Sequence, residues 1–131
     1  MRAYQTALLL ACAAVSGPSI AHHSFAMFDS TQRLTLQGTV KALNWTNPHV
    51  TLLVQGAPAG GKPELWTLEL TSPGNLNRLG WTKRSLASGD AVQVELNPLR
   101  DGRKGGAFRK VTILSTGQVL TASLIDQVKP K

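Results

Sequence analysis

Residues 65–81, LWTLELTSPGNLNRLGW, contain the change of pattern that decides the fold. Apolar residues alternate with others over 65–71, which places Trp66, Leu68 and Leu70 on one face. A period of two is typical of a strand with one buried face. We therefore expect a strand that ends near the middle of the quoted stretch.

The second half of the stretch predicts a short helix. Ser72 is a typical helix N-cap, and Pro73 follows it at the first helical position. Leu76 and Leu79 lie three residues apart, so that one helical face could bury both. The stretch as a whole thus predicts a strand followed directly by a helix.

Two strands are expected before this stretch. Residues 33–42 alternate between apolar and polar, and Gly38 among them indicates a bulge or a sharp bend. The residues expected to face inward are Leu34, Leu36, Gly38, Val40 and Ala42. Asn47-Pro48 then breaks the chain, and residues 49–55 predict the second strand.

Two or three strands are expected after the helix. Gly89-Asp90 is a tight-turn signal before a fourth alternating segment. Residues 101–106 predict a loop, residues 107–116 a fifth strand, and residues 117–125 a short sixth strand at an edge. The inward residues of the fourth and fifth strands are expected to be Val92, Val94, Leu96, Val111 and Ile113.

The order of elements indicates the fold class. Three strands, a short helix and two or three further strands are the order of a small Greek-key barrel of the oligonucleotide/oligosaccharide-binding (OB) type. Closing the barrel removes exposed strand edges. We predict an all-β, OB-like barrel of five to six strands, closed or partly open, over residues 33–125. A small β-sandwich is the alternative.

The N-terminus has the features of a secretory signal. Arg2 precedes an apolar run at 7–15, and Ser19 and Ala21 are the small residues expected at positions −3 and −1 of a cleavage site. We predict a signal peptide over residues 1–21 and a periplasmic or secreted protein. The apolar run is too short to cross a bilayer, so we expect no membrane-spanning helix.

Cleavage after Ala21 removes 21 of the 131 residues and leaves 110. Such a chain fits one small domain with an N-terminal arm, 22–32, and a flexible tail, 126–131. Lipidation of Cys12 is the alternative to cleavage after Ala21, although the apolar segment before it is short. If Cys12 is removed, the mature chain has no thiol for a disulfide or a metal site.

The mature N-terminus suggests a metal site. Cleavage would make His22 the first residue, and its α-amine and ring nitrogen could chelate one ion. A third nitrogen from His49 would complete a T-shaped set that suits Cu(II). This arrangement resembles the histidine brace of periplasmic copper carriers and copper monooxygenases. His23 is the alternative third ligand, and Asp29 and Glu69 could add oxygen ligands.

Cleavage one residue earlier would give a different copper site. The chain would then begin Ala21-His22-His23, with a histidine in third place. That is the arrangement of an amino-terminal copper or nickel site, which binds through the amine, two amides and the imidazole of His23.

The net charge points to a second kind of ligand. The formal charge is +7, and removal of Arg2 with the signal leaves +6. An exported protein is separated from nucleic acid, so we expect none as partner; the natural acidic partners are glycans, lipid headgroups and small anions. Five cations fall within or beside the expected 98–110 loop: Arg100, Arg103, Lys104, Arg109 and Lys110.

This basic loop is the alternative binding site. In an OB barrel the loop between the fourth and fifth strands borders the ligand face. The five cations could hold an anionic group there. Aromatic residues could supply a stacking platform beside it: Trp45, Trp66, Trp81 and Phe108.

No complete catalytic set is visible in the sequence. The mature chain lacks a cysteine nucleophile, and no serine, histidine and aspartate occur in a known motif context. The Gly60-Gly61-Lys62 sequence lacks the glycine spacing and the following helix of a phosphate loop. We therefore predict a binding protein rather than an enzyme. The sequence does not indicate its oligomeric state.

Four segments together resemble a known group of proteins. They are AHHSFAMFD at 21–29, GTVKALNWTNPHV at 38–50, LELTSPGNLNRLGW at 68–81 and LASGDAVQVELNPLRDG at 86–102. In this combination the chain resembles a widespread family of small secreted bacterial proteins, a domain of unknown function. The resemblance implies export and a single small domain, and it implies no activity.

Overall fold

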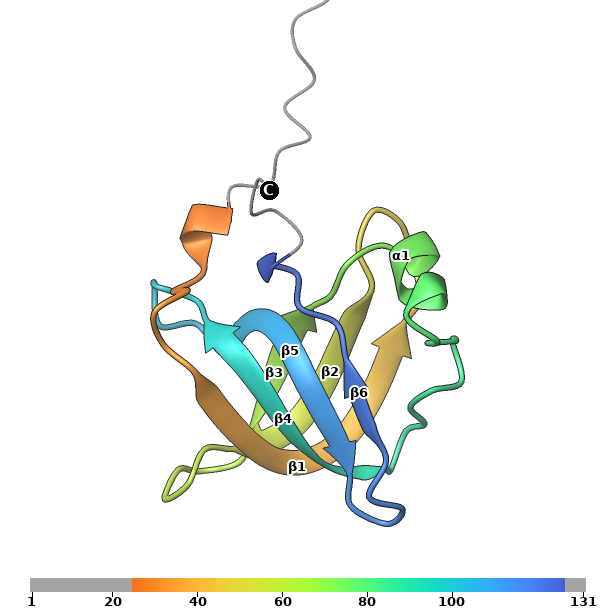
Figure 1. Cartoon of the computed structure of the whole chain (residues 1–131). Helices are drawn as coiled ribbons and strands as arrows, with labels where there is room; N and C mark the ends of the chain where they lie inside the picture. Colours follow the sequence, from red (N-terminus) through yellow and green to blue (C-terminus); the bar gives the residue numbers. More distant parts are fainter. Residues whose placement is uncertain (1–24, 127–131) are drawn as a thin grey trace, which may run out of the picture.

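The computed structural model describes residues 25–126 (Figure 1). The elements are η1 (Phe25–Met27), β1 (Leu34–Asn44), β2 (Thr51–Ala57), β3 (Glu64–Glu69), α1 (Pro73–Arg78), β4 (Ala91–Pro98), β5 (Gly105–Ile113) and β6 (Val119–Thr121). The predicted signal peptide, Cys12, His22 and His23 lie outside the described residues, as does the tail from 127 to 131.

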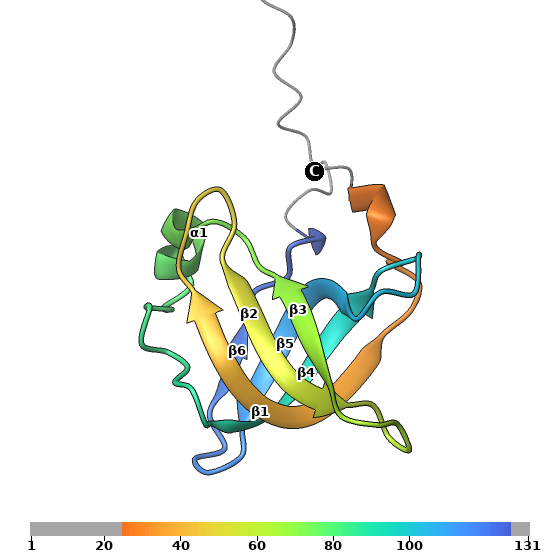
Figure 2. The ribbon, with the colours of Figure 1, turned by 180° about the vertical axis from the view of Figure 1, so that it is seen from behind.

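The six strands form one sheet that closes on itself. Their order is β3-β2-β1-β4-β5-β6, and neighbours in this order are antiparallel. A parallel pairing of β3 with β5 joins the two sides, so that five strands make a closed barrel and β6 extends the sheet beside β5 (Figures 1 and 2). The OB-like barrel with α1 between β3 and β4 is confirmed, and the sandwich alternative is wrong.

The alternating pattern predicted most of the core correctly. The expected inward residues of the third, fourth and fifth strands are all buried, and the second segment buries Val50, Leu52 and Val54. Trp81 and Phe108 lie at the centre, with their rings edge to face and 5.5 Å between centroids. The indole Nε1 of Trp81 donates to the Thr121 carbonyl at 3.0 Å, which satisfies the polar atom of a nearly inaccessible side chain.

The first strand departs from the prediction at one point. Its register shifts between Val40 and Ala42, so Lys41 is an extra residue and the bulge is not at Gly38. An extra residue reverses the faces of those that follow. Leu43 therefore packs against the core in place of Ala42. Gly38 has another role, because it lies directly opposite Gly56 of β2 where the two backbones approach closely.

The helix forms where it was predicted but buries only one leucine. Ser72 is its N-cap, and the Ser72 hydroxyl accepts from the backbone N–H of Asn75 at 3.2 Å. Leu76 is fully buried, whereas Leu79 is 51% exposed, so the expectation for Leu79 is wrong. The helix ends before it, and Gly80, with φ of 89°, turns the chain so that the next residue enters the core.

The segment before β1 is held against the β4–β5 loop. Phe28 is buried and forms an antiparallel bridge with Leu99, and these contacts fix the arm. The backbone N–H of Asp29 donates to the Pro98 carbonyl, and the N–H of Arg100 donates to the Met27 carbonyl. These bonds extend the sheet into the arm and place Met27 at the rim of the barrel.

A buried amide joins the arm, β4 and β5. Asn97 of β4 is fully buried, and its Nδ2 donates to the carbonyls of Gln32 at 2.6 Å and Asp29 at 3.3 Å. Its Oδ1 accepts from the Arg109 guanidinium at 3.1 Å. One side chain thus satisfies two backbone carbonyls and one cation, and it fixes three segments relative to one another.

We expect Asn97→Leu to lower the free energy of unfolding by about 2–3 kcal/mol. Leucine has a similar volume to asparagine but makes no hydrogen bonds, so several buried polar groups would lose their partners. Urea denaturation would measure the change. Asn77→Leu on the exposed surface of α1 is the control, and it should stay within about 0.5 kcal/mol of the parent protein. Equal effects of the two substitutions would contradict a joining role for Asn97.

Candidate functional site

Four polar residues share the outer face of β2 and β3. Thr51 of β2 pairs with Glu69 of β3, and Thr67 follows the same outward phase. His49 lies two residues before Thr51, at the end of the β1–β2 connection. This surface, in front in Figure 2, is the one on which OB barrels commonly bind ligands.

His49 and Glu69 contact each other on this face. The Nδ1 of His49 and the Oε1 of Glu69 form a short hydrogen bond, and the side chains are only 22% and 23% exposed. In the neutral ring, a carboxylate that accepts from Nδ1–H leaves the lone pair on Nε2. A neutral His49 that donates to Glu69 through Nδ1–H would use Nε2 as its metal ligand.

A cavity of about 360 Å³ lies beside this pair. Thr51, Thr67 and Glu69 form its floor, and Met27 and Phe28 of the arm form part of its wall. Lys104 and neighbouring residues of the β4–β5 loop complete it. The arm that follows the predicted cleavage site and the Glu69 carboxylate, which contacts His49, therefore line the same cavity.

The predicted metal ligands are only partly described by the structure. His49 is on the β2–β3 face, while His22 and His23 lie outside residues 25–126. Within 25–126 there is no group of three or more histidine, cysteine, aspartate or glutamate residues that could hold a metal ion. A metal site at His49 would therefore need ligands from the segment before Phe25.

Asp29, the other expected oxygen ligand, makes its hydrogen bonds within the arm. Its carboxylate accepts from the hydroxyl of Thr31 at 2.6 Å, from the Thr31 backbone N–H at 3.0 Å and from Gln32 Nε2 at 3.1 Å. The Thr31 hydroxyl is the main cause that holds the pKa of Asp29 below its usual value. The carboxylate thus stabilises the turn that leads into β1.

The five cations of the predicted basic loop do not form one cluster. The connection between β4 and β5 spans only residues 99–104, because β5 begins at Gly105. Arg100, Arg103 and Lys104 belong to this connection, whereas Arg109 and Lys110 are part of β5. The expected loop of 98–110 is therefore wrong in extent, and its cations lie in two places.

Each of the five cations also has a carboxylate partner. Arg100 lies 3.6 Å from Asp29, and its Nε donates to the Ala26 carbonyl. Arg103 binds Asp101 at 2.7 Å, and the pKa of Asp101 is lowered chiefly by the backbone N–H of Arg103. The other three pairs are Lys104 with Glu64, Arg109 with Asp126 and Lys110 with Glu95.

The aromatic residues do not form a stacking platform. Trp66, Trp81 and Phe108 are buried in the core, and Trp45 packs against the edge of the core cluster. The Nε1 of Trp66 donates to the Gly56 carbonyl at 3.1 Å, and the Lys104 ammonium lies 5.4 Å from the ring centroid of Trp66. These contacts stabilise the barrel wall beneath the loop.

Several residues of the cavity were not singled out from the sequence. Thr51 and Thr67 point outward from their strands, as Glu69 does. The alternation of the sequence predicts this shared face. Met27 lies in the arm, and only the docking of the arm on Leu99 places it at the cavity.

The fold and this face define a small OB-type barrel with a polar pair and a cavity on its β2–β3 surface. The chain belongs to the family of unknown function DUF6152, whose model matches residues 9–109. Comparisons with curated proteins and with solved structures gave no match. Among the described residues no helix is both long and apolar enough to cross a membrane.

Proposed function

We propose that the protein is exported, loses residues 1–21, and binds Cu(II) with its new N-terminus. The α-amine and ring nitrogen of His22 would form a chelate, and the imidazole of His49 would supply the third nitrogen. Cu(II) prefers tetragonal sites with nitrogen ligands, which this set provides. We propose metal binding rather than catalysis as the role of the site.

The observation that carries the proposal is the contact between His49 and Glu69. Metal-binding histidines commonly donate their other ring N–H to a carboxylate, which orients the ring and raises its basicity. Glu69 is placed to orient the His49 ring in this way, because its Oε1 contacts Nδ1. Strand pairing holds Glu69, since Thr51 and Glu69 are partners in the sheet, and His49 lies two residues before Thr51.

The position of the arm supports the same proposal. Met27 and Phe28 line the cavity that Glu69 also lines. His22 lies three positions before Phe25, and three extended residues cover about 10 Å. The arm is anchored on the barrel by Phe28 and Asp29, so the entropy lost on bringing the terminus to His49 is limited to a few residues.

The test is a copper titration of the protein that begins at His22, by calorimetry and electron paramagnetic resonance. We expect one Cu(II) per chain with nitrogen hyperfine structure. His49→Leu should weaken binding about 100-fold, and Glu69→Gln about 10-fold, in line with effects of removing a partner of a metal-bound histidine. Glu95→Gln, which removes a paired carboxylate from β4, is the control and should bind like the parent.

Two results would contradict the proposal. If His49→Leu binds copper as tightly as the parent, His49 is not a ligand and His23 takes its place. If all variants bind weakly and with more than one ion per chain, the N-terminal histidines have only the affinity of a solvated peptide. Mass spectrometry of the exported protein would test cleavage after Ala21 separately.

A further inference from the structure

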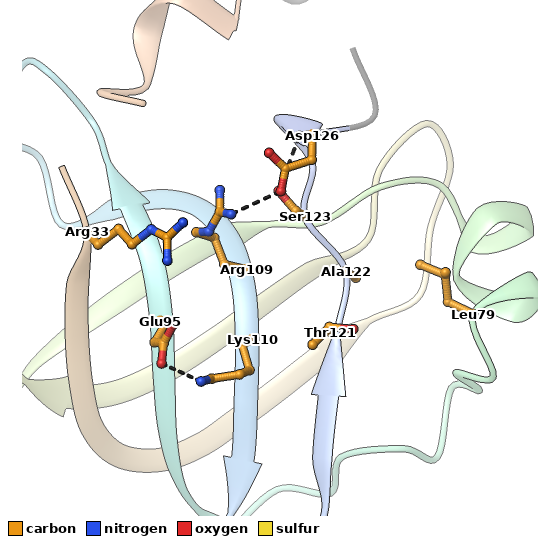
Figure 3. Close-up of a pocket in the computed structure, with 9 residues that line it drawn as sticks. All are labelled: Arg33, Leu79, Glu95, Arg109, Lys110, Thr121, Ala122, Ser123 and Asp126. Atoms are coloured by element: carbon orange, nitrogen blue, oxygen red, sulfur yellow. Dashed lines mark hydrogen bonds and ion pairs between the residues drawn. The ribbon is translucent and has the colours of Figure 1, made fainter. Parts of the chain in front are cut away.

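A second cavity lies on the outer face of β4, β5 and β6 (Figure 3). It has a volume of about 490 Å³ and shares no lining residue with the cavity beside Glu69. Three cations line it, Arg33, Arg109 and Lys110, against two carboxylates, Glu95 and Asp126. Its size is in the usual range for small-molecule sites, and its charge is positive.

A β-bulge brings two of these cations to the same side. Glu95 pairs with Lys110 and Leu96 with Phe108, so Arg109 is an extra residue in β5. Consecutive residues of a regular strand point to opposite faces. Here both Arg109 and Lys110 line the cavity. Bulges that redirect a side chain in this way are frequent next to functional sites.

The buried Asn97 links the Arg109 guanidinium to the backbone directly before Arg33. Its Oδ1 accepts from Arg109, and its Nδ2 holds the carbonyl of Gln32, the residue directly before Arg33. Because Asn97 is fully buried, these bonds are shielded from water. Asn97 is therefore a positioning residue for a site that contains both guanidinium groups.

The charges in the cavity are incompletely balanced. Lys110 binds Glu95 at 2.6 Å, and Arg109 binds Asp126 at 3.0 Å. Arg33 has no acidic partner among residues 25–126, and its guanidinium points toward that of Arg109 in Figure 3. Two guanidinium groups that line one cavity favour an oxyanion between them, because it can accept hydrogen bonds from both.

We propose that this cavity binds a small phosphate ester, held between the guanidinium groups of Arg33 and Arg109. A phosphate monoester carries up to two negative charges and three acceptor oxygens. The hydroxyl groups of Thr121 and Ser123 line the same cavity and can donate to these oxygens. Leu79, half exposed at its edge, offers an apolar surface for the organic part of the ester.

Asp126 occupies part of this site as an internal competitor. Its carboxylate binds Arg109, yet its side chain is 50% exposed and lies close to the C-terminus. The pair is half exposed on its Asp126 side, so a doubly charged ligand that binds Arg109 can replace this carboxylate. Removing the carboxylate should therefore make the site more available to an added phosphate ester.

The test is a calorimetric titration of the copper-free mature protein with phenyl phosphate at low salt. We expect one saturable site, and Arg33→Gln should weaken it at least about tenfold, which is the effect of one charged hydrogen-bond donor. Asp126→Asn should strengthen it about threefold or more. Arg84→Gln removes the same charge from an exposed position outside the cavity and should have no effect beyond a small change from net charge.

Arg33 is the preferred site of substitution, because it is exposed and its loss leaves no buried group unpaired. Arg109→Gln should also abolish binding, and its unfolding curve would be measured alongside. Titration with inorganic phosphate distinguishes a phosphate ester from free phosphate as the ligand. If inorganic phosphate binds more weakly than phenyl phosphate, a phosphate ester is supported. If the two bind equally, the role of Leu79 is overturned. Absence of saturable binding, or equal weakening by Arg33→Gln and Arg84→Gln, would overturn the proposal.

Discussion

Gly38→Ala is expected to remove most of the stability of the barrel, with a loss of about 4 kcal/mol or more in the free energy of unfolding. A Cβ at this position would overlap the carbonyl oxygen of Gln55 and lie 2.5 Å from the Cα of Gly56. Both atoms belong to the backbone of β2, so no side-chain rotation can relieve the overlap. The strands β1 and β2 would have to separate at their closest point.

The measurement is urea denaturation followed by tryptophan fluorescence. Gly74→Ala is the matched control, because a Cβ there meets no atom within 4 Å and the residue lies in α1. Alanine is the better helix former, so this control should be neutral or stabilised by up to about 1 kcal/mol. The free energy of unfolding of a small domain is only about 5–15 kcal/mol. The Gly38→Ala protein should therefore be partly unfolded in water or unfold at a much lower urea concentration. A loss below about 1 kcal/mol would contradict the close approach of β1 and β2.

This role of Gly38 shows what the sequence could and could not supply. A glycine within an alternating segment indicated an irregular strand, and the irregularity was placed at Gly38. The register instead shifts at Lys41, and Gly38 is needed for its close contact with Gly56. The pattern alone does not separate these two roles, because the contact involves a residue 18 positions away that only strand pairing brings opposite.

The buried faces of the later strands were predictable because period two is a local property. Trp66 and Val94 have the inward phase in their own segments, and both are buried. Leu79 was not predictable in the same way. Its spacing from Leu76 suited one helical face, but the helix is only six residues long and ends at Arg78. Gly80, with φ of 89°, turns the chain directly after the helix, and Leu79 at the C-cap is left half exposed.

The sequence supplied one member of the site and left its partner undecided. His49 stood out as the only histidine distant from the predicted N-terminus. Glu69 was one of two carboxylates considered, and the register of β2 with β3 selects it over Asp29. In the same way, Arg109 and Arg33 are far apart in sequence, and only the bulge and Asn97 bring them to one cavity.

Blocking the mature N-terminus is expected to have the largest effect on copper binding. A Gly-Ser-Gly extension before His22 converts its α-amine into an amide, which no longer offers a lone pair at neutral pH. The chelate with the His22 ring is then lost together with one of three nitrogen ligands. We expect the affinity for Cu(II) to fall about 1,000-fold, which corresponds to about 4 kcal/mol. Competition titration against a copper chelator would measure it.

A shorter extension separates the two possible N-terminal sites. Adding back only Ala21 removes the brace but places His23 third in the chain, where an amino-terminal copper site can form without His49. In that protein His49→Leu should have no effect, whereas in the protein that begins at His22 it should weaken binding strongly. Enzymatic removal of the extension should restore the parent affinity in the same sample. If the Gly-Ser-Gly protein binds copper as tightly as the parent, the α-amine is not a ligand, and the contact between His49 and Glu69 serves only to join β2 and β3.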